Sequence, residues 1–129
     1  FHLEAAGRNT SKYIDWIHEL GMKAGVAINP DVPVGKLFKY IGKADYFLVM
    51  TVFAGFGGQK FIYESLDRTK TLKDEILKRG AHTEVEVDGG VNSENISALR
   101  ESGVDIVVAG STVFKAEDPA GAIAALKAA

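Results

Sequence analysis

The stretch TEVEVDGGVN, residues 83–92, joins a short strand to a glycine turn. Glutamate and valine alternate over Glu84 to Val87 with the period of two that is typical of a β-strand. The two glycines after Asp88 favour a tight turn, because glycine adopts positive φ without steric cost. We therefore expect a strand over residues 83–87 that brings Asp88 to the end of a sheet.

Similar short apolar segments recur on both sides of this stretch. Together with it, the expected strands cover residues 1–5, 24–28, 46–51, 83–87 and 105–109. Between them, helical periodicity and capping residues predict helices from Asn9 or Thr10 to Gly21, from Leu66 to Gly80, from Ser93 or Asn95 to Gly103, and from Asp118 onward. A shorter helix is expected over residues 34–41.

Alternating strands and helices predict a single α/β domain over residues 1–129, with parallel strands joined by right-handed crossovers. Two architectures fit this pattern: a doubly wound, flavodoxin-like sheet and part of a (β/α)₈ barrel. Five units in 129 residues are about 26 residues each, so eight would need about 205, within the range of such barrels. Periodicity alone leaves both open.

Composition excludes several classes of protein. Apolar residues make up 47% and charged residues 25%, as in an ordinary globular domain and unlike a disordered, fibrous or coiled-coil chain. No apolar run approaches the ~18 residues of a membrane span, and a net charge of −2 with dispersed basic residues argues against nucleic-acid binding. The chain has no cysteine, which excludes disulfides, thiolate metal sites and a cysteine nucleophile.

Three glycine-rich loops follow expected strands, at residues 51–59, 88–91 and 110–112. In both architectures the carboxyl edge of the sheet binds ligands. Backbone N–H groups in such loops, with the positive end of a helix, form a phosphate site without needing a lysine. We expect this site at Gly89, Gly90, Gly110 and Ser111; the alternative is that these glycines serve turn geometry alone.

Asp88 is the most informative single residue, because it ends a strand beside the expected phosphate site. A carboxylate there can ligate a divalent metal or transfer a proton next to a carbonyl. The alternative is that it caps its own Gly-Gly turn. Met50 is most simply a core residue, and His2 and Glu4 could line the site or be buried.

Five stretches resemble the ribulose-phosphate 3-epimerase family of the ribulose-phosphate-binding barrels. They are FHLEA at 1–5, GMKAGVAINP at 21–30, LVMTVFAGFGGQKF at 48–61, VEVDGGVN at 85–92 and VAGSTVF at 108–114. They occur in the family's order and cover essentially the whole chain. The resemblance favours the barrel, of which this chain would form the last five βα units.

The resemblance implies an isomerase of the pentose phosphate pathway that inverts C3 between D-ribulose 5-phosphate and D-xylulose 5-phosphate. Two aspartates would act on opposite faces of the sugar, with a divalent metal such as Zn, Fe, Mn or Co. Asp88 matches the later aspartate, both catalytic residue and metal ligand. The substrate-binding residues would be Met50, Gly55, Phe56, Gly57, Gly58, Asp88, Gly89, Gly90, Gly110 and Ser111.

Two departures qualify this expectation. Ala54 stands where the family usually has proline, and Phe53 where a polar residue is common. The other aspartate and the metal-binding histidines belong to strands that this chain does not contain, so we expect it to be inactive alone. Alternatives are an epimerase for another ketose phosphate, such as allulose 6-phosphate, or a non-catalytic sugar-phosphate-binding fragment. We also expect a homo-oligomer, because unpaired edge strands recruit other chains. We further expect a cytoplasmic location.

Overall fold

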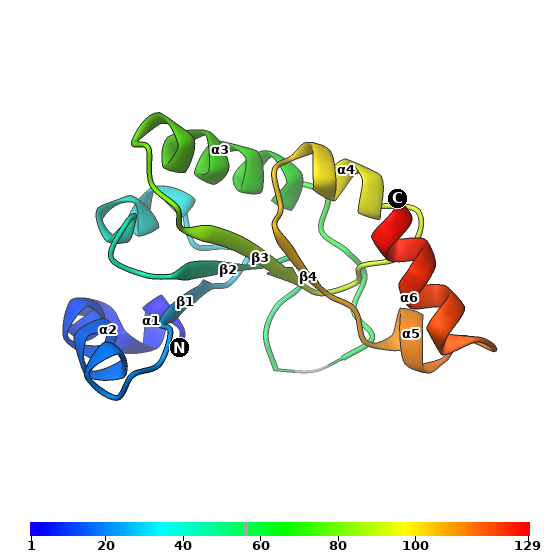
Figure 1. The fold of residues 1–129 in the computed structure, drawn as a ribbon, viewed down its shortest axis with the longest axis horizontal. Coiled ribbons are helices and arrows are strands. Elements are labelled where there is room, and N and C mark those ends of the chain that lie inside the picture. Colours follow the sequence, from blue (N-terminus) through cyan, green and yellow to red (C-terminus); the bar gives the residue numbers. More distant parts are fainter. Residues whose placement is uncertain (56) are drawn as a thin grey trace.

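The computed structural model describes residues 1–55 and 57–129. Its centre is a four-stranded parallel sheet in the order β1-β2-β3-β4 (Figure 1). The strands are β1 (Gly25–Ile28), β2 (Tyr46–Met50), β3 (Glu84–Asp88) and β4 (Ile106–Val108). This sequential order lacks the reversal that defines a doubly wound sheet, so it decides between the two expected architectures in favour of barrel-type winding.

The helices confirm most of the expected segments. They are α1 (Leu3–Ala6), α2 (Thr10–Glu19), α3 (Ser65–Lys78), α4 (Ile96–Glu101), α5 (Ser111–Phe114) and α6 (Pro119–Ala128), with 3₁₀ segments η1 (Gly7–Asn9) and η2 (Val34–Tyr40). Helix α6 begins as expected, because the Asp118 carboxylate accepts the Gly121 N–H at 3.1 Å. Gly80 follows α3 with a φ of 65°, the left-handed conformation in which many helices end.

The expected strand over residues 1–5 is wrong. The chain runs parallel to β1 only through an isolated bridge between His2 and Ala27, and then turns into α1. The His2 carbonyl accepts the N–H groups of Ala5 and Ala6 at 3.2 and 3.1 Å, which starts the helical turn. Residues 3–6 are Leu-Glu-Ala-Ala, strong helix formers with no β-branched side chain, so local propensity overrides the apolar pattern.

The other strands lie within one or two residues of their expected bounds. Two aspartates at the amino edge of the sheet tie neighbouring strands together. Asp45 precedes β2 and accepts the Ala24 N–H at 2.6 Å, just before β1. Asp105 precedes β4 and accepts the Val85 N–H of β3 at 2.8 Å. Because each carboxylate binds the start of the adjacent strand, these two hydrogen bonds help to set the register between neighbouring strands at the amino edge of the sheet.

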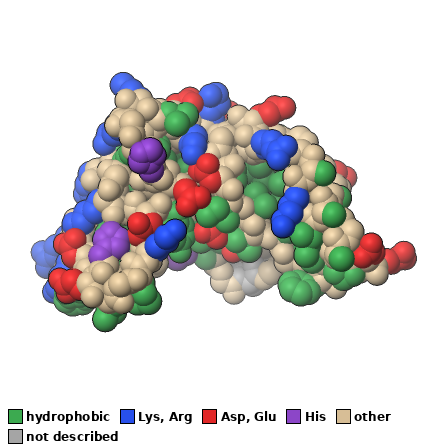
Figure 2. Space-filling model, in the orientation of Figure 1, with side chains coloured by type: hydrophobic (Ala, Val, Ile, Leu, Met, Phe, Trp, Pro, Cys, Tyr) green, Lys and Arg blue, Asp and Glu red, His purple; other side chains and the backbone are tan. Residues whose placement is uncertain are grey.

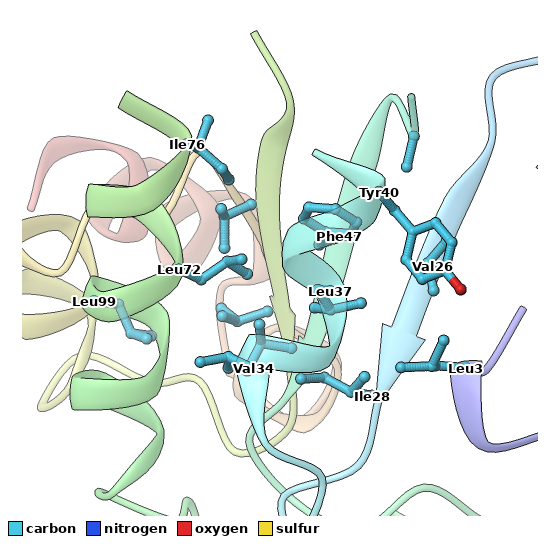
Figure 3. Close-up of a cluster of buried hydrophobic side chains, with 14 of the residues drawn as sticks. Leu3, Val26, Ile28, Val34, Leu37, Tyr40, Phe47, Leu72, Ile76 and Leu99 are labelled. Carbon is cyan, nitrogen blue, oxygen red and sulfur yellow. The ribbon is translucent and has the colours of Figure 1, made fainter. Parts of the chain in front are cut away.

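One face of the sheet carries the hydrophobic core. Alternate residues of β1, β2 and β3 point to this face and pack against η2, α3 and α4 (Figure 3). Fully buried members are Val26, Ile28, Leu37, Phe47, Val49, Leu72, Val85, Val87 and Leu99. The intervening residues of each strand must therefore face the other side.

The opposite face of β3 carries the acidic residues Glu84, Glu86 and Asp88. Burial raises the pKa of Glu86, and the negative charge of Asp88 raises it further. On β4 the same face presents Ile106 and Val108, which remain exposed to solvent. No helix among the described residues is long and apolar enough to cross a membrane.

We expect Glu86→Gln to stabilise the chain more at about pH 7 than at about pH 4. A carboxyl whose folded pKa is raised contributes stability below its unfolded pKa and loses that contribution as pH rises through the folded value. Glutamine removes the charged form, so the gain appears only where Glu86 would ionise. Thermal unfolding at both pH values measures this, with Glu84→Gln on the same face as the control. An equal effect of Glu86→Gln at both pH values would contradict the prediction.

The end of the molecule around α4, α5 and α6 gathers exposed apolar side chains (Figure 2). A cleft of about 490 Å³, lined mostly by apolar residues, lies beside β4 there. Among the described residues, β4 pairs with β3 alone, which leaves its outer edge open. Open edges and apolar patches favour association with other chains.

We therefore expect residues 1–129 to self-associate in sedimentation experiments. Phe114, whose exposed fraction is 84%, lies at the apolar end, so Phe114→Asp should shift the distribution toward monomer without unfolding the chain. Leu77→Asp is the matched control, because Leu77 is 62% exposed on α3. A wild-type chain that stays monomeric with a cooperative melt would show that this end needs no partner.

Candidate functional site

A cleft of about 860 Å³ lies at the carboxyl ends of β2, β3 and β4. The strand register places three of its lining residues side by side. Met50 of β2 is paired with Asp88 of β3, and Asp88 is paired with Val108 of β4. The loops that follow these strands form its rim. The ligand-binding edge expected from the sequence is thus a hollow in the structure.

Nearly all residues that the sequence singled out meet in this cleft. Its lining includes Met50, Gly55, Gly57, Gly58, Asp88, Gly89, Gly90, Gly110 and Ser111. Phe56, the remaining one, lies outside the described residues. Met50, which the pattern alone assigned to the core, is 7% exposed and also reaches the cleft.

Gly89 and Gly90 are required by the chain itself. Their φ angles are 127° and 67°, a region that side chains rarely adopt. A Cβ at Gly89 would lie 2.4 Å from the Val52 side chain, and one at Gly90 would lie 2.8 Å from the Phe61 backbone nitrogen. At these two positions the turn alone explains glycine, whether or not a ligand binds.

Gly110 differs from them. Its φ is −97° and its ψ is −88°, and a Cβ built on it would meet no atom within 4 Å. Gly57 likewise has open space around it. Packing within the described chain therefore does not explain these glycines. Open space beside Gly110, where α5 begins, leaves room for a ligand to approach the backbone.

The Asp88 side chain does not cap its own turn. Within the described residues its carboxylate accepts no hydrogen bond, and its backbone carbonyl accepts the Thr51 N–H at 2.9 Å. The turn is held instead by Asn95, whose side-chain nitrogen donates to the Gly90 carbonyl at 2.9 Å, and whose side-chain oxygen accepts the Asn92 N–H at 2.9 Å. The Asp88 carboxylate therefore remains available to the cleft.

The loop at residues 53–59 is fastened at its base. The Gln59 side chain makes two hydrogen bonds to the backbone of Phe53. Its oxygen accepts the Phe53 N–H at 3.2 Å, and its nitrogen donates to the Phe53 carbonyl at 2.6 Å. Asn29, which follows β1, accepts the Ala54 N–H on its side-chain oxygen at 2.9 Å. Asn29 could not be identified from the sequence, because no local pattern shows that a residue 25 positions away meets the loop.

Two basic side chains also line the cleft, His2 and Lys115. The His2 side chain is 31% exposed, so it is a lining residue rather than a buried one, and its Nδ1 lies 3.0 Å from a carboxylate oxygen of Glu4. Lys115 directly follows α5, four residues after Ser111. This spacing could have identified Lys115 as a lining residue from the sequence. With Asp88, these residues give the cleft one acidic and two basic groups.

The described part of the chain holds no cluster of three or more His, Cys, Asp or Glu side chains that could bind a metal ion. Asp88 is the acidic residue among those that line the cleft. A carboxylate suits a divalent cation, but a stable site needs further ligands. Among the described lining residues, Asp88 is thus the single carboxylate that could bind a metal, and His2 is the single imidazole.

Comparison with known proteins supports the resemblance. The family model described as "Ribulose-phosphate 3 epimerase family" matches residues 1–114. The protein named ribulose-phosphate 3-epimerase from Mycobacterium tuberculosis is 39% identical over 127 residues, covering 98% of this chain and 55% of that protein. Its namesake from Serratia marcescens is 40% identical over 118 residues, covering 92% and 56%. The chain thus spans about half the length of these curated relatives.

A solved structure described as native KDPGal superimposes with a TM-score of 0.60 at 19% identity, covering 92% of this chain and 52% of that one. This likeness concerns the fold alone. With the sequential parallel sheet, it identifies the architecture as part of a (β/α)₈ barrel. The family match includes all four strands and the glycine loops around the cleft. The chain therefore belongs to the ribulose-phosphate 3-epimerase family.

Proposed function

We propose that this chain supplies one catalytic aspartate and the phosphate site of an epimerase that interconverts D-ribulose 5-phosphate and D-xylulose 5-phosphate. One observation carries the proposal. The Asp88 carboxylate accepts no hydrogen bond from the described residues, and Asp88 lines the same cleft as the glycine turns at 89–90 and 110–111. The chain that carries these residues belongs to this family. Homologues named ribulose-phosphate 3-epimerase support the reaction class.

In the proposed reaction Asp88 transfers the proton at C3. That proton is weakly acidic because only the neighbouring C2 carbonyl stabilises the charge left behind. A bound divalent metal, with Asp88 as one ligand, would offset the negative charge that develops on the substrate oxygens. Inversion requires a second acid on the opposite face of the sugar. Among the described residues that line the cleft, Asp88 is the single acidic one, so the second group must come from outside this lining.

The phosphate would bind beside Gly110 and Ser111. The backbone there begins α5, and open space in front of Gly110 admits an anion to its N–H groups. Lys115 lines the same cleft and adds a positive charge. Gly89 and Gly90 shape the neighbouring turn. A cytoplasmic location and a homo-oligomeric state belong to the proposal as well, the former resting on the resemblance alone.

A second candidate function is sugar-phosphate binding without catalysis. The described residues that line the cleft include a single carboxylate, which favours this function for residues 1–129 taken alone. Solvent hydrogen exchange at C3 of the sugar distinguishes the two. We expect no detectable exchange with residues 1–129 and exchange with a complete epimerase that contains them.

Asp88→Asn should lower kcat of such a complete epimerase by at least ~10³-fold. The substitution removes an acid–base group and also weakens the metal site. General acid–base catalysis alone contributes a factor of about 10²–10⁴. Steady-state kinetics measure the loss. Glu84→Gln, at the other end of the same strand face, is the control and should leave kcat unchanged. A decrease in kcat of only a few-fold in Asp88→Asn would show that Asp88 has a structural and not a catalytic role.

Gly110→Val should weaken phosphate binding about tenfold or more, because a branched side chain fills the open space before α5. Titration of residues 1–129 with D-ribulose 5-phosphate, followed by calorimetry, measures this. Gly35→Val is the matched control, since Gly35 also has open space around it and lies outside the cleft. Unchanged affinity in Gly110→Val would show that the phosphate binds elsewhere.

A further inference from the structure

The turn after β3, residues 89–91, is held by side chains from other segments of the chain. The hydroxyl of Thr51, which directly follows β2, donates to the Gly89 carbonyl at 2.5 Å. The side-chain nitrogen of Asn95, which precedes α4, donates to the Gly90 carbonyl at 2.9 Å. Both donor residues are buried. Two successive peptide units of the turn are therefore fixed between the end of β2 and the start of α4.

Thr112 supplies a third hydrogen bond of the same kind. It lies on α5, and its hydroxyl donates to the Val91 carbonyl at 2.5 Å. Among the hydrogen bonds of the described residues, this is the single one that joins residues 110–116 to another segment of the chain. The strand that leads to α5, β4, pairs with β3 over only three residue pairs. The Thr112 hydroxyl therefore sets where the start of α5 lies relative to the turn after β3.

The held carbonyls determine the direction of the N–H groups in this turn. All peptide bonds of the described chain are trans, so the N–H that follows a carbonyl points the opposite way. The N–H of Gly90 points away from Thr51, and the N–H of Val91 points away from Asn95. Neither N–H makes a hydrogen bond within the described residues, and both residues line the cleft. Because Val91 is only 2% exposed, an unpaired N–H there is unfavourable unless a ligand or water accepts it.

We propose that Thr112 is a positioning residue for the phosphate of the ligand. Adjacent backbone N–H groups in a turn form a concave site for an anion. By holding the Val91 carbonyl, the Thr112 hydroxyl keeps the turn at residues 89–91 at a set distance from Gly110 and Ser111, which line the same cleft. One phosphate can then contact both segments at once. That the anion is the phosphate of D-ribulose 5-phosphate rests on the proposed function, whereas the hydrogen bonds are properties of the chain alone.

This role predicts an effect on binding and not on the chemical step. The phosphate does not react, so its N–H donors bind the ground state and the transition state alike. In a complete epimerase that contains these residues, Thr112→Val should raise KM about fivefold, the usual effect of one lost hydrogen bond. It should leave kcat within about twofold of wild type, in contrast to Asp88→Asn. Thr112→Ser, which keeps the hydroxyl, should restore KM.

Amide chemical shifts of the chain test the contact directly, with inorganic phosphate as the probe. The amide protons of Gly90 and Val91 should move downfield on titration, because an N–H that donates to an anion is deshielded. Thr112→Val should weaken this binding about fivefold, and Thr112→Ser should bind like wild type. Thr10→Val is the matched control, because the Thr10 hydroxyl also donates to a backbone carbonyl, that of Gly7 at 2.7 Å, outside the cleft.

The hydrogen bond itself can be followed without any ligand. The carbonyl ¹³C resonance of Val91 should move upfield in Thr112→Val and keep its position in Thr112→Ser and Thr10→Val. Thr112→Ala removes the same hydroxyl with a smaller side chain and is a second variant should valine not fit. Thermal unfolding of each variant shows that the fold is retained.

The outcomes separate this inference from the proposed function. If phosphate leaves the Gly90 and Val91 amides of the wild-type chain unmoved, or binds equally well to Thr112→Val and Thr112→Ala, the inference is overturned even where the complete epimerase is active. A lower kcat at unchanged KM in Thr112→Val would overturn it too. Amide shifts that need the Thr112 hydroxyl would support the inference even where the complete epimerase exchanges no hydrogen at C3, and the proposed function alone would then be wrong.

Discussion

Burial of one face of the parallel sheet is the constraint on which the rest of this structure depends. Side chains alternate along a strand, so once Val85 and Val87 pack beneath α3 and α4, Glu86 and Asp88 have only the other face available. A shift of one residue would exchange the two sets and bury the carboxylates. The position of Asp88 in the cleft thus follows from the packing of its hydrophobic neighbours.

Hydrogen bonds between distant segments then turn the sheet edge into a defined cleft. At the amino edge, Asp45 and Asp105 fix the starts of neighbouring strands. At the carboxyl edge, Asn29 and Asn95 hold the loops that follow. Each uses a short polar side chain to satisfy a backbone group that the sheet leaves unpaired. The glycine loops owe their shape to these bonds as much as to glycine itself.

The glycines of the cleft look alike in the sequence, but the structure distinguishes Gly89 and Gly90 from Gly110. Gly89 and Gly90 are fixed by positive φ and by contacts with Val52 and Phe61, so they build the turn. Gly110 has a negative φ, and a Cβ built on it would face open space. Packing of the described residues does not forbid a side chain at Gly110, so the open space there can admit a ligand. This distinction is what separates turn geometry from a candidate ligand site.

The sequence by itself determined the α/β class, most helices, and the glycine loops with Asp88, because these follow from local periodicity and turn chemistry. Nine of the ten residues that it singled out for the site line the cleft. It failed at residues 1–5, where an apolar pattern without β-branched side chains forms α1 instead of a strand. Only the tertiary structure decided the sequential strand order and the contacts of Glu4, Asn29 and Ala54. Those contacts join segments about 25 residues apart, and no local preference of a chain specifies which distant groups will meet.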